Sequence, residues 1–311
     1  IEDLAANDIE AISFIYNIPL WLINLWISEF GRDKTEDLCA WFNEQPKLTA
    51  RINTILIDIP QCLTMLNEHG WDVTQDSNYE DIIYINSHRG SLEKSEAFIK
   101  GYITFMDKAS MLVARLVNPQ PGERILDCCA APGGKSMYMA TLMNNVGSLM
   151  SCDIHEHKIE LMNSNADRLG ASIVHTKVQD ATKLPDSWNS YFDRVLVDAP
   201  CSGLGILQKK LDMRWRKQES ILRELPPLQL AILERAAMTV KEKGYLIYST
   251  CTLNYKENEE VVESFLQKHK EFSIIPVAED FPLKSNSGMI TTYPPTDDMD
   301  GFFMVKMQRI S

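Results

Sequence analysis

The sequence lacks the features that mark exported and membrane-spanning proteins. It has no run of eighteen or more apolar residues, and its most apolar stretch, residues 14–30, is interrupted by Asn17, Pro19, Asn24 and Ser28. That stretch predicts a buried or amphipathic helix. The chain begins at Ile1 without a signal-peptide pattern, so nothing indicates export, and its upstream part is expected to be missing. A chain of 311 residues that is 45% hydrophobic predicts a globular protein of about two domains.

The chain also lacks any Cys-x-x-Cys pair. Its 7 cysteines fit neither a zinc ribbon nor a disulfide framework. Unpaired cysteines are typical of a reducing compartment. We therefore predict a cytoplasmic protein with no bound metal and no membrane contact. The cysteines are Cys39, Cys62, Cys128, Cys129, Cys152, Cys201 and Cys251.

Positive charge is scarce as well. The formal net charge is -12, with 31 Lys and Arg against 43 Asp and Glu. Proteins that bind nucleic acid regardless of its sequence usually carry a basic excess, because their cations replace the counterions of the phosphates. A nucleic-acid site in this chain must therefore be a local cluster of positive charge.

Two patterns of hydrophobicity divide the chain near residues 102–107. The first part predicts a small α+β unit, and the second alternates helices with short apolar strands, which is typical of an α/β fold with an open parallel sheet and right-handed crossovers. In the first part we expect helices at 19–30, 36–43, 61–68 and 95–100 and strands at 49–57 and 81–85. In the second we expect strands at 124–130, 147–153, 172–178, 193–199, 244–250 and 301–307.

Ligands bind such sheets at the carboxyl ends of the strands. The strand ends of this chain carry polar and reactive residues: "LDCCAAPGGKS" (126–136), Asp153, Asp180, "DAPCSG" (198–203) and "STCT" (249–252). We therefore expect one ligand cleft to be built from these ends.

The glycine loop admits two classes of enzyme. "GGKS" resembles the end of a P-loop, and "VLVD" (195–198) could hold the magnesium of a nucleotide. The P-loop pattern, however, requires glycine where the chain has Cys129, and Pro132 removes an amide donor. The alternative is a nucleoside-binding loop in which Gly133 and Gly134 allow a ligand to approach the backbone closely.

The acidic strand ends favour an adenosine ligand. Asp153 lies where a carboxylate would accept hydrogen bonds from ribose hydroxyls, and Asp180 could accept one from an adenine amino group. Each Asp could instead cap the helix that follows it. A cap is the better interpretation for one Asp taken alone, whereas several strand ends in register favour a ligand.

Two cysteines differ from the rest. Cys128, Cys129 and Cys152 lie in or beside apolar strands, where packing is the default role. Cys201 and Cys251 follow neighbouring strand ends in polar surroundings, where a thiol pKa can be lowered. Both thiols are expected to face one cleft. Two cysteines without a positioned histidine make a poor zinc site.

These motifs, together with "RW" in "LDMRWRK" (211–217), "YSTCTLNYKENEEVV" (248–262) and "DGFFMVKM" (300–307), resemble the bacterial Sun-type (RsmB-like) 16S ribosomal RNA cytosine-C5 methyltransferases. The similarity extends from about Asp107 to the C-terminus. Before it, "WFNEQPKLTARINT" (41–54) resembles the small ferredoxin-like RNA-binding domain of that family, and "IPLWLINLWISEFG" (18–31) resembles the segment that precedes this domain.

The resemblance implies a domain organisation. It predicts a helical linker at 1–32, left after a missing NusB-like domain, a small α+β RNA-binding domain at 33–104 and a methyltransferase domain at 105–311. The last is expected to be Rossmann-like, with a mostly parallel seven-stranded sheet whose last strand is antiparallel. The expected protein is a monomer.

The resemblance also implies an activity, methyl transfer from S-adenosyl-L-methionine to carbon 5 of a cytosine in RNA. Spacing alone does not decide which thiol attacks, because the "PC" thiol is the nucleophile in related DNA enzymes. The RNA enzymes use the "TC" thiol, which makes Cys251 the nucleophile and Cys201 the residue that assists release. Asp198 is implied to contact the N3 and N4 edge of the base, and Lys135 to lie near the catalytic centre. The implied cofactor-binding residues are Cys129, Ala130, Ala131, Pro132, Gly133, Gly134, Lys135, Asp153, Asp180 and Asp198.

RNA contacts are expected from local basic residues. Residues 208–218 surround Trp215 with cations and offer phosphate contacts and a stacking ring. The competing interpretation is a solvated helix start with a buried Trp. The predicted RNA-binding residues are Lys209, Lys210, Arg214, Trp215 and Arg216 with Lys47 and Arg51 of the small domain; Lys217 and Arg89 are further candidates. A nucleotide hydrolase, a catalytically silent RNA-binding protein, and methylation of another rRNA position or of tRNA remain the alternatives.

Overall fold

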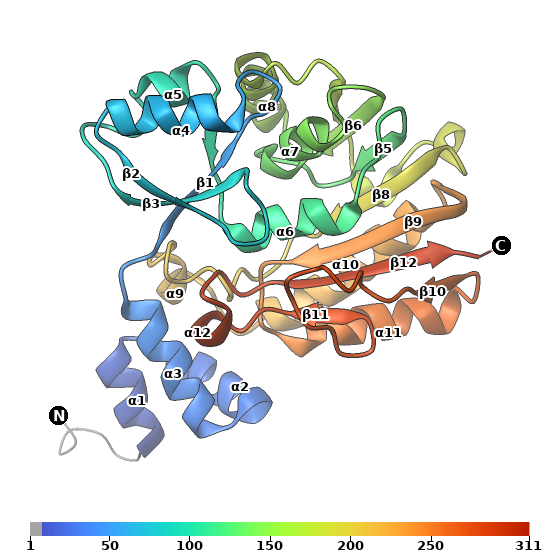
Figure 1. The fold of residues 1–311 in the computed structure, drawn as a ribbon. Helices are drawn as coiled ribbons and strands as arrows, with labels where there is room; N and C mark the ends of the chain where they lie inside the picture. Colours follow the sequence, from blue (N-terminus) through green and yellow to red (C-terminus); the bar gives the residue numbers. More distant parts are fainter. Residues whose placement is uncertain (1–7, 311) are drawn as a thin grey trace.

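The computed structural model describes residues 8–310 and has three parts (Figure 1). The first is a group of three helices, α1 (Asp8–Tyr16), α2 (Leu20–Phe30) and α3 (Arg32–Asn43). α2 buries Leu22, Ile23 and Trp26 in an apolar cluster with the other two helices. Two separate segments of the large domain contribute Leu204 and Leu253 to this cluster. Within the described part of the chain, no single helix is long and apolar enough to cross a membrane; α1 and α2 together would pass by length and composition, but they are bent by 116°.

The second part is a small antiparallel sheet in the order β2-β3-β1-β4, which gives the ferredoxin-like domain. Its strands are β1 (Leu48–Ile52), β2 (Asp72–Gln75), β3 (Ile82–Ser87) and β4 (Ile103–Phe105), and its helices are α4 (Ile59–Glu68) and α5 (Glu96–Ile99). Ile83 and Ile85 alternate along β3 and pack with Cys62 and Leu66 of α4. The strand expected at 49–57 ends at Ile52, because the chain turns there.

The third part is the predicted open sheet, which the structure confirms as mostly parallel. β5 (Arg124–Asp127), β6 (Ser148–Asp153), β7 (Val174–Val178), β8 (Phe192–Asp198) and β9 (Val240–Thr250) are parallel to one another. β12 (Phe303–Arg309) is antiparallel to β9, as predicted for the last strand. The strand order is β10-β12-β9-β8-β5-β6-β7, and the two short strands that the sequence did not predict, β10 (Phe272–Ile274) and β11 (Met289–Thr291), pair with β12.

Helices cover both faces of this sheet (Figure 1). Along β8, Leu196 packs into one apolar cluster and its neighbours Val195 and Val197 into the other. The sheet is therefore buried on both sides, which explains its near-continuous apolar strands. The helices of one face are α6 (Lys108–Val117), α7 (Gly134–Leu142) and α8 (Glu156–Leu169), and those of the other are α10 (Ile221–Ala237) and α11 (Glu259–Lys268). The short helices α9 (Met213–Arg216) and α12 (Pro294–Asp297) lie in connecting segments.

Arg51 joins the small domain to the large one, and its predicted contact with RNA phosphate is wrong. Its side chain is fully buried. The guanidinium lies over the Tyr138 ring, 5.1 Å from the centroid, and donates to Thr141 Oγ1 at 3.2 Å. Burial lowers the pKa of Arg51 to about 10. A cation enclosed in this way packs the two domains together and is not available to a phosphate.

The predicted RNA contact of Arg214 is wrong for a similar reason. It is 3% exposed, and its guanidinium donates to Asn43 Oδ1 at 2.8 Å and to the Phe42 carbonyl. Both acceptors lie at the end of α3. Arg214 therefore attaches α9 to the N-terminal helices, and it cannot serve as an exposed phosphate ligand.

Candidate active site

A cavity of about 480 Å³ lies at the carboxyl ends of the parallel strands. It is placed beside β5, where the strand order reverses, which is the usual ligand site of an open α/β sheet. A volume in this range suits a small organic ligand. As predicted from the strand ends, one cavity collects residues that follow five strands, among them Cys129, Asp153, Asp180, Asp198, Cys201 and Cys251.

The glycine loop forms one wall of the cavity. Gly133 has a φ of 100°, in the left-handed region that favours glycine, and it precedes α7. A side chain at this position would also meet Met162 Cγ at 3.2 Å. The loop contributes Cys128, Cys129 and Ala131 to the cavity lining. Burial raises the pKa of both thiols well above the ordinary value, so these two cysteines remain protonated.

Asp153, at the end of β6, and Asp180, just after β7, both adopt local turns. Asp153 Oδ1 accepts a hydrogen bond from the His155 N–H at 3.0 Å. Asp180 Oδ1 accepts from both the N–H and the hydroxyl of Thr182, and these bonds lower the pKa of Asp180. Both carboxylates also line the cavity. The capping and the ligand interpretations are therefore compatible, because each turn uses one carboxylate oxygen.

The part of the cavity lined by Asp153 and Asp180 fits an adenosine group. Apolar side chains, including Ile154, Ala181, Leu228 and Ile232, line it next to the two carboxylates. An apolar wall suits a purine ring, and carboxylates suit hydroxyl and amino donors. S-Adenosylmethionine combines these groups, so the residues present fit that cofactor.

Lys135 and Asp198 form a partly buried ion pair between the glycine loop and β8. Lys135 Nζ lies 2.7 Å from Asp198 Oδ2, and Asp198 Oδ1 accepts from Ser249 Oγ at 2.8 Å. Burial alone would lower the pKa of Lys135, but the charge and the hydrogen bond of Asp198 raise it above its ordinary value. The lysine is therefore a fixed cation, and both oxygens of Asp198 are held in place.

The structure brings the two predicted thiols into contact. Cys201 Sγ and Cys251 Sγ are 3.2 Å apart, and the Cys251 N–H donates to Cys201 Sγ at 3.3 Å. The hydrogen bond to Cys251, together with burial and the charge of Glu257, raises the pKa of Cys201 well above its ordinary value. Cys201 therefore holds a proton directly beside the sulfur of Cys251.

Sequence reasoning missed two polar residues of this site. Ser249 orients Asp198, and Glu257 is fully buried beside the turn that carries Cys201. Ser249 lies two residues before Cys251 in "STCT". For Glu257 the only available signal was an acidic residue close after "STC", because glutamate is usually exposed and nothing in the sequence reveals its burial.

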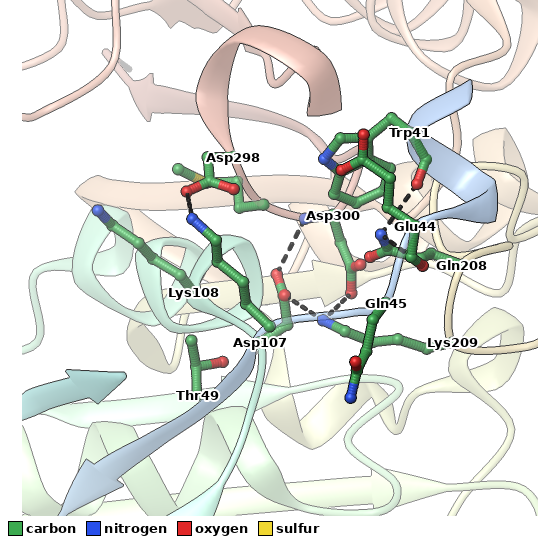
Figure 2. A pocket seen from close by; sticks show the side chains of 12 residues that line it. Trp41, Glu44, Gln45, Thr49, Asp107, Lys108, Gln208, Lys209, Asp298 and Asp300 are labelled. Carbon is green, nitrogen blue, oxygen red and sulfur yellow. Dashed lines mark hydrogen bonds and ion pairs between the residues drawn. The ribbon is translucent and has the colours of Figure 1, made fainter. Parts of the chain in front are cut away.

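The predicted RNA-binding lysines differ in how accessible they are. Lys209 Nζ binds two carboxylates, those of Asp107 and Asp300 (Figure 2). Lys47 pairs with Asp298. The charge of Lys209 is thus already matched inside the protein, while Lys47 lies in an exposed pair. Figure 2 shows the pairs of Lys209 at a small pocket between the small and the large domain.

Trp215 is the clearest candidate for stacking with RNA. Its side chain is 60% exposed, so the competing interpretation of a buried Trp is wrong. Lys210 and Arg216 are also exposed on this segment. Arg216 pairs with Asp212 at 3.2 Å, an exposed pair that costs little to open.

The fold and the site together define a Rossmann-like methyltransferase with a ferredoxin-like domain in front of it. Residues 114–308 match the family model of the 16S rRNA methyltransferase RsmB/F, and residues 18–90 match the ferredoxin-like domain of RsmF/B-like methyltransferases. The chain belongs to the RsmB/F methyltransferase family, whose cofactor is S-adenosylmethionine. This membership rules against the nucleotide hydrolase alternative.

Similar proteins agree with this assignment. "Probable ribosomal RNA small subunit methyltransferase B" of Bacillus subtilis is 37% identical over 94% of this chain and 66% of its own length. Ribosomal RNA small subunit methyltransferase B of Serratia proteamaculans is 29% identical over the same shares. The chain thus spans about two thirds of the length of these relatives.

Two solved structures share the fold. The crystal structure of PH0851 is 32% identical, with a TM-score of 0.91 over 97% of this chain and 68% of that chain. The structure of NSun6 from Pyrococcus horikoshii with SFG is 21% identical, with a TM-score of 0.84 over 93% of this chain and 97% of that chain. The likeness to NSun6 shows the fold alone.

Proposed function

We propose that this protein transfers a methyl group from S-adenosylmethionine to carbon 5 of a cytosine in RNA, through a covalent bond between Cys251 and carbon 6 of the base. The observation that carries the proposal is the contact between two thiols in a cavity that is also lined by Asp198, the partner of Lys135. A methyltransferase acting on oxygen or nitrogen needs no thiol, whereas carbon 5 of cytosine is a poor nucleophile and requires activation.

Cys251 is proposed to attack because its neighbour keeps its proton. Cys201 has a raised pKa and lies within hydrogen-bond distance of Cys251, so it can stabilise a Cys251 thiolate by donating to it. The nearby Lys135 ammonium favours a negative charge on Cys251 in the same way. Addition of this thiolate to carbon 6 would give carbon 5 the enamine character that it needs.

Asp198 is proposed to hold the N3 and N4 edge of the cytosine. Its carboxylate is fixed between Lys135 and Ser249, which leaves it little freedom to rotate. S-Adenosylmethionine supplies an electrophilic methyl group, and Cys129, Asp153 and Asp180 would hold that cofactor. The backbone of residues 130–134 would complete its binding loop.

Release requires removal of the carbon 5 proton followed by elimination of the Cys251 sulfur. Cys201 is proposed to assist this step, directly or through a water, because its sulfur is next to the bond that must break. Because Cys201 is protonated at rest, it must first give up its own proton, to water or to the departing Cys251 sulfur, before it can take up the carbon 5 proton.

The proposed substrate is a cytosine of the small-subunit ribosomal RNA. The names of the relatives and the ferredoxin-like domain support RNA as the substrate. Exposed Trp215, Lys210 and Arg216 offer a ring and cations for an unstacked strand. Another rRNA position or a tRNA is the alternative, which bisulfite sequencing of both RNA classes from a deletion strain would identify.

Two matched serine variants test the mechanism. With substrate RNA and cofactor, Cys251→Ser should form no covalent adduct, whereas Cys201→Ser should accumulate an adduct that survives denaturing electrophoresis. The reversed pattern would exchange the roles of the two cysteines, and the absence of labelled methyl transfer by the wild-type protein to any RNA would contradict the proposed function.

A further inference from the structure

The buried carboxylate of Glu257 lies at the centre of a hydrogen-bond network beside the two thiols. Its side chain is fully buried, although a charged carboxylate is costly to remove from water. Among the described residues no cation forms an ion pair with it. Four donors from neutral groups satisfy it instead, which is the arrangement that makes a buried charge tolerable.

Glu257 is tied to the turn that carries Cys201. Glu257 Oε2 accepts from the Ser202 N–H at 2.8 Å and from Gln229 Nε2 at 2.9 Å. Gln229 Nε2 also donates to the Pro200 carbonyl at 3.0 Å. The two neighbours of Cys201 in the chain are therefore both anchored, one directly by Glu257 and the other through Gln229.

The same carboxylate is tied to the turn that carries Cys251. Glu257 Oε1 accepts from Ser202 Oγ and from Asn254 Nδ2, the latter at 3.0 Å. Ser202 Oγ also lies 2.7 Å from the hydroxyl of Thr252, the residue after Cys251. A single side chain thus connects the segments after β8 and β9 on which the thiols stand.

We propose that Glu257 is a positioning residue that keeps Cys201 and Cys251 in contact. The assignment rests on the proposed function for its role in turnover, but the thiol geometry can be tested on the protein alone. Catalysis tolerates only small errors in the positions of reacting groups, on the order of 0.5 Å. A loosened turn would therefore lower the reaction rate even though every reacting group is still present. The negative charge of Glu257 also helps to keep Cys201 protonated.

Glu257→Gln is the main test, because it keeps the shape of the side chain. One of the two carboxylate oxygens would become an NH₂ group, which cannot accept the hydrogen bonds that this oxygen receives. Ser202→Ala removes only the hydroxyl bridge and is the milder variant. Glu260→Gln is the matched control, since Glu260 is exposed in the first turn of α11 and lies outside the network.

The first readout is the equilibrium between the Cys201 and Cys251 thiols and their disulfide in glutathione buffers, measured by mass spectrometry on the full chain. Loosening the turns disfavours the disulfide, because the two sulfurs are then held in contact for less of the time. We expect the equilibrium constant to fall about tenfold in Glu257→Gln and about threefold in Ser202→Ala, with no change in Glu260→Gln. Wild-type values in both network variants would overturn the proposal, and Ser202→Ala alone decides if Glu257→Gln does not fold.

The second readout separates positioning from general damage. In Glu257→Gln, kcat should fall about tenfold or more, while KM for RNA and Kd for S-adenosylhomocysteine stay within about twofold. Alkylation of Cys201 should also begin at lower pH than in the wild type. Unchanged kcat together with an unchanged alkylation profile would overturn the proposal. Failure of the methylation proposal itself would appear as a wild-type protein inactive on RNA, which leaves the disulfide equilibrium interpretable.

Discussion

The cavity has a cofactor half, lined by Asp153 and Asp180, and a thiol half, lined by Cys201 and Cys251, and the two are built in different ways. In the cofactor half, Asp153 and Asp180 take hydrogen bonds from residues two positions further along the chain. In the thiol half, Cys201 contacts Cys251 across 50 positions, and Glu257 contacts Ser202 across 55. The first half depends on local turns, and the second depends on how two strands are aligned.

The register of β8 and β9 explains the second half. Asp198 pairs with Ser249 across these parallel strands. The thiols follow this pair by three and two residues, so both leave the sheet at nearly the same height. Because the two halves depend on different contacts, we expect a substitution in one half to leave the function of the other half unchanged.

Cys251→Ser is expected to show the largest difference between its effect on turnover and its effect on cofactor binding. Turnover on RNA should fall on the order of a thousandfold or more, because the group that activates the base is lost. Binding of S-adenosylhomocysteine, measured by calorimetry, should match that of the wild type. A comparable loss of cofactor affinity would show that the two halves are coupled.

Asp127 lies on the strand between the halves and should make stability depend on pH. Burial raises its pKa to about 7, against a hydrogen bond from Ser136 that lowers it. The folded state thus binds this proton more tightly than the unfolded state, so the contribution to stability is full below pH about 4 and is lost as pH rises to about 7.

Asp127→Asn removes this titration and mimics the protonated form. Urea unfolding at pH 5 and pH 8 should therefore show the variant gaining stability over the wild type as pH rises, by an amount on the order of a few kcal/mol. Parallel changes in both proteins between the two pH values would contradict the assigned cause.

Asp153→Asn should affect only the cofactor half. Loss of a charged acceptor should weaken S-adenosylhomocysteine binding by about tenfold to a hundredfold, the cost of one hydrogen bond to a charged group. The disulfide equilibrium of Cys201 and Cys251 should stay at the wild-type value. Tight cofactor binding in this variant would assign Asp153 to the turn alone.

Trp215→Ala should have the smallest effect and should fall outside both halves. RNA affinity is expected to drop by about tenfold if one base stacks on the ring. Stability should not change, because the ring is exposed. Trp215→Phe, which keeps an aromatic face, is the matched control, and equal affinities for the alanine variant and the wild type would exclude a stacking role.

The sequence predicted the large sheet well because its strands are buried on both faces and are separated by helices. It predicted the small domain less well: β2 and β4 are short, and β1 ends five residues earlier than expected. Among the site residues, the strand ends predicted that Cys201, Cys251 and Asp198 face one cavity, and all three line it. Cys201 contacts Cys251, and Lys135, which the family resemblance placed near the catalytic centre, contacts Asp198.

The basic residues were the least predictable. Arg51 and Arg214 were expected at an RNA surface, yet both are buried at contacts between parts of the chain. The sequence shows an arginine in the same way whether its guanidinium contacts a phosphate, a tyrosine ring or a backbone carbonyl. Only the positions of its neighbours distinguish these uses.

By itself, the sequence determined the alternation of strands and helices, the strand ends that carry reactive groups and the resemblance to one methyltransferase family. These properties depend only on the order of residues within short segments. The tertiary structure alone decided that Cys201 touches Cys251, that Glu257 joins their turns and that two arginines are enclosed. Those contacts depend on strand register and domain packing, which bring together residues far apart in the chain.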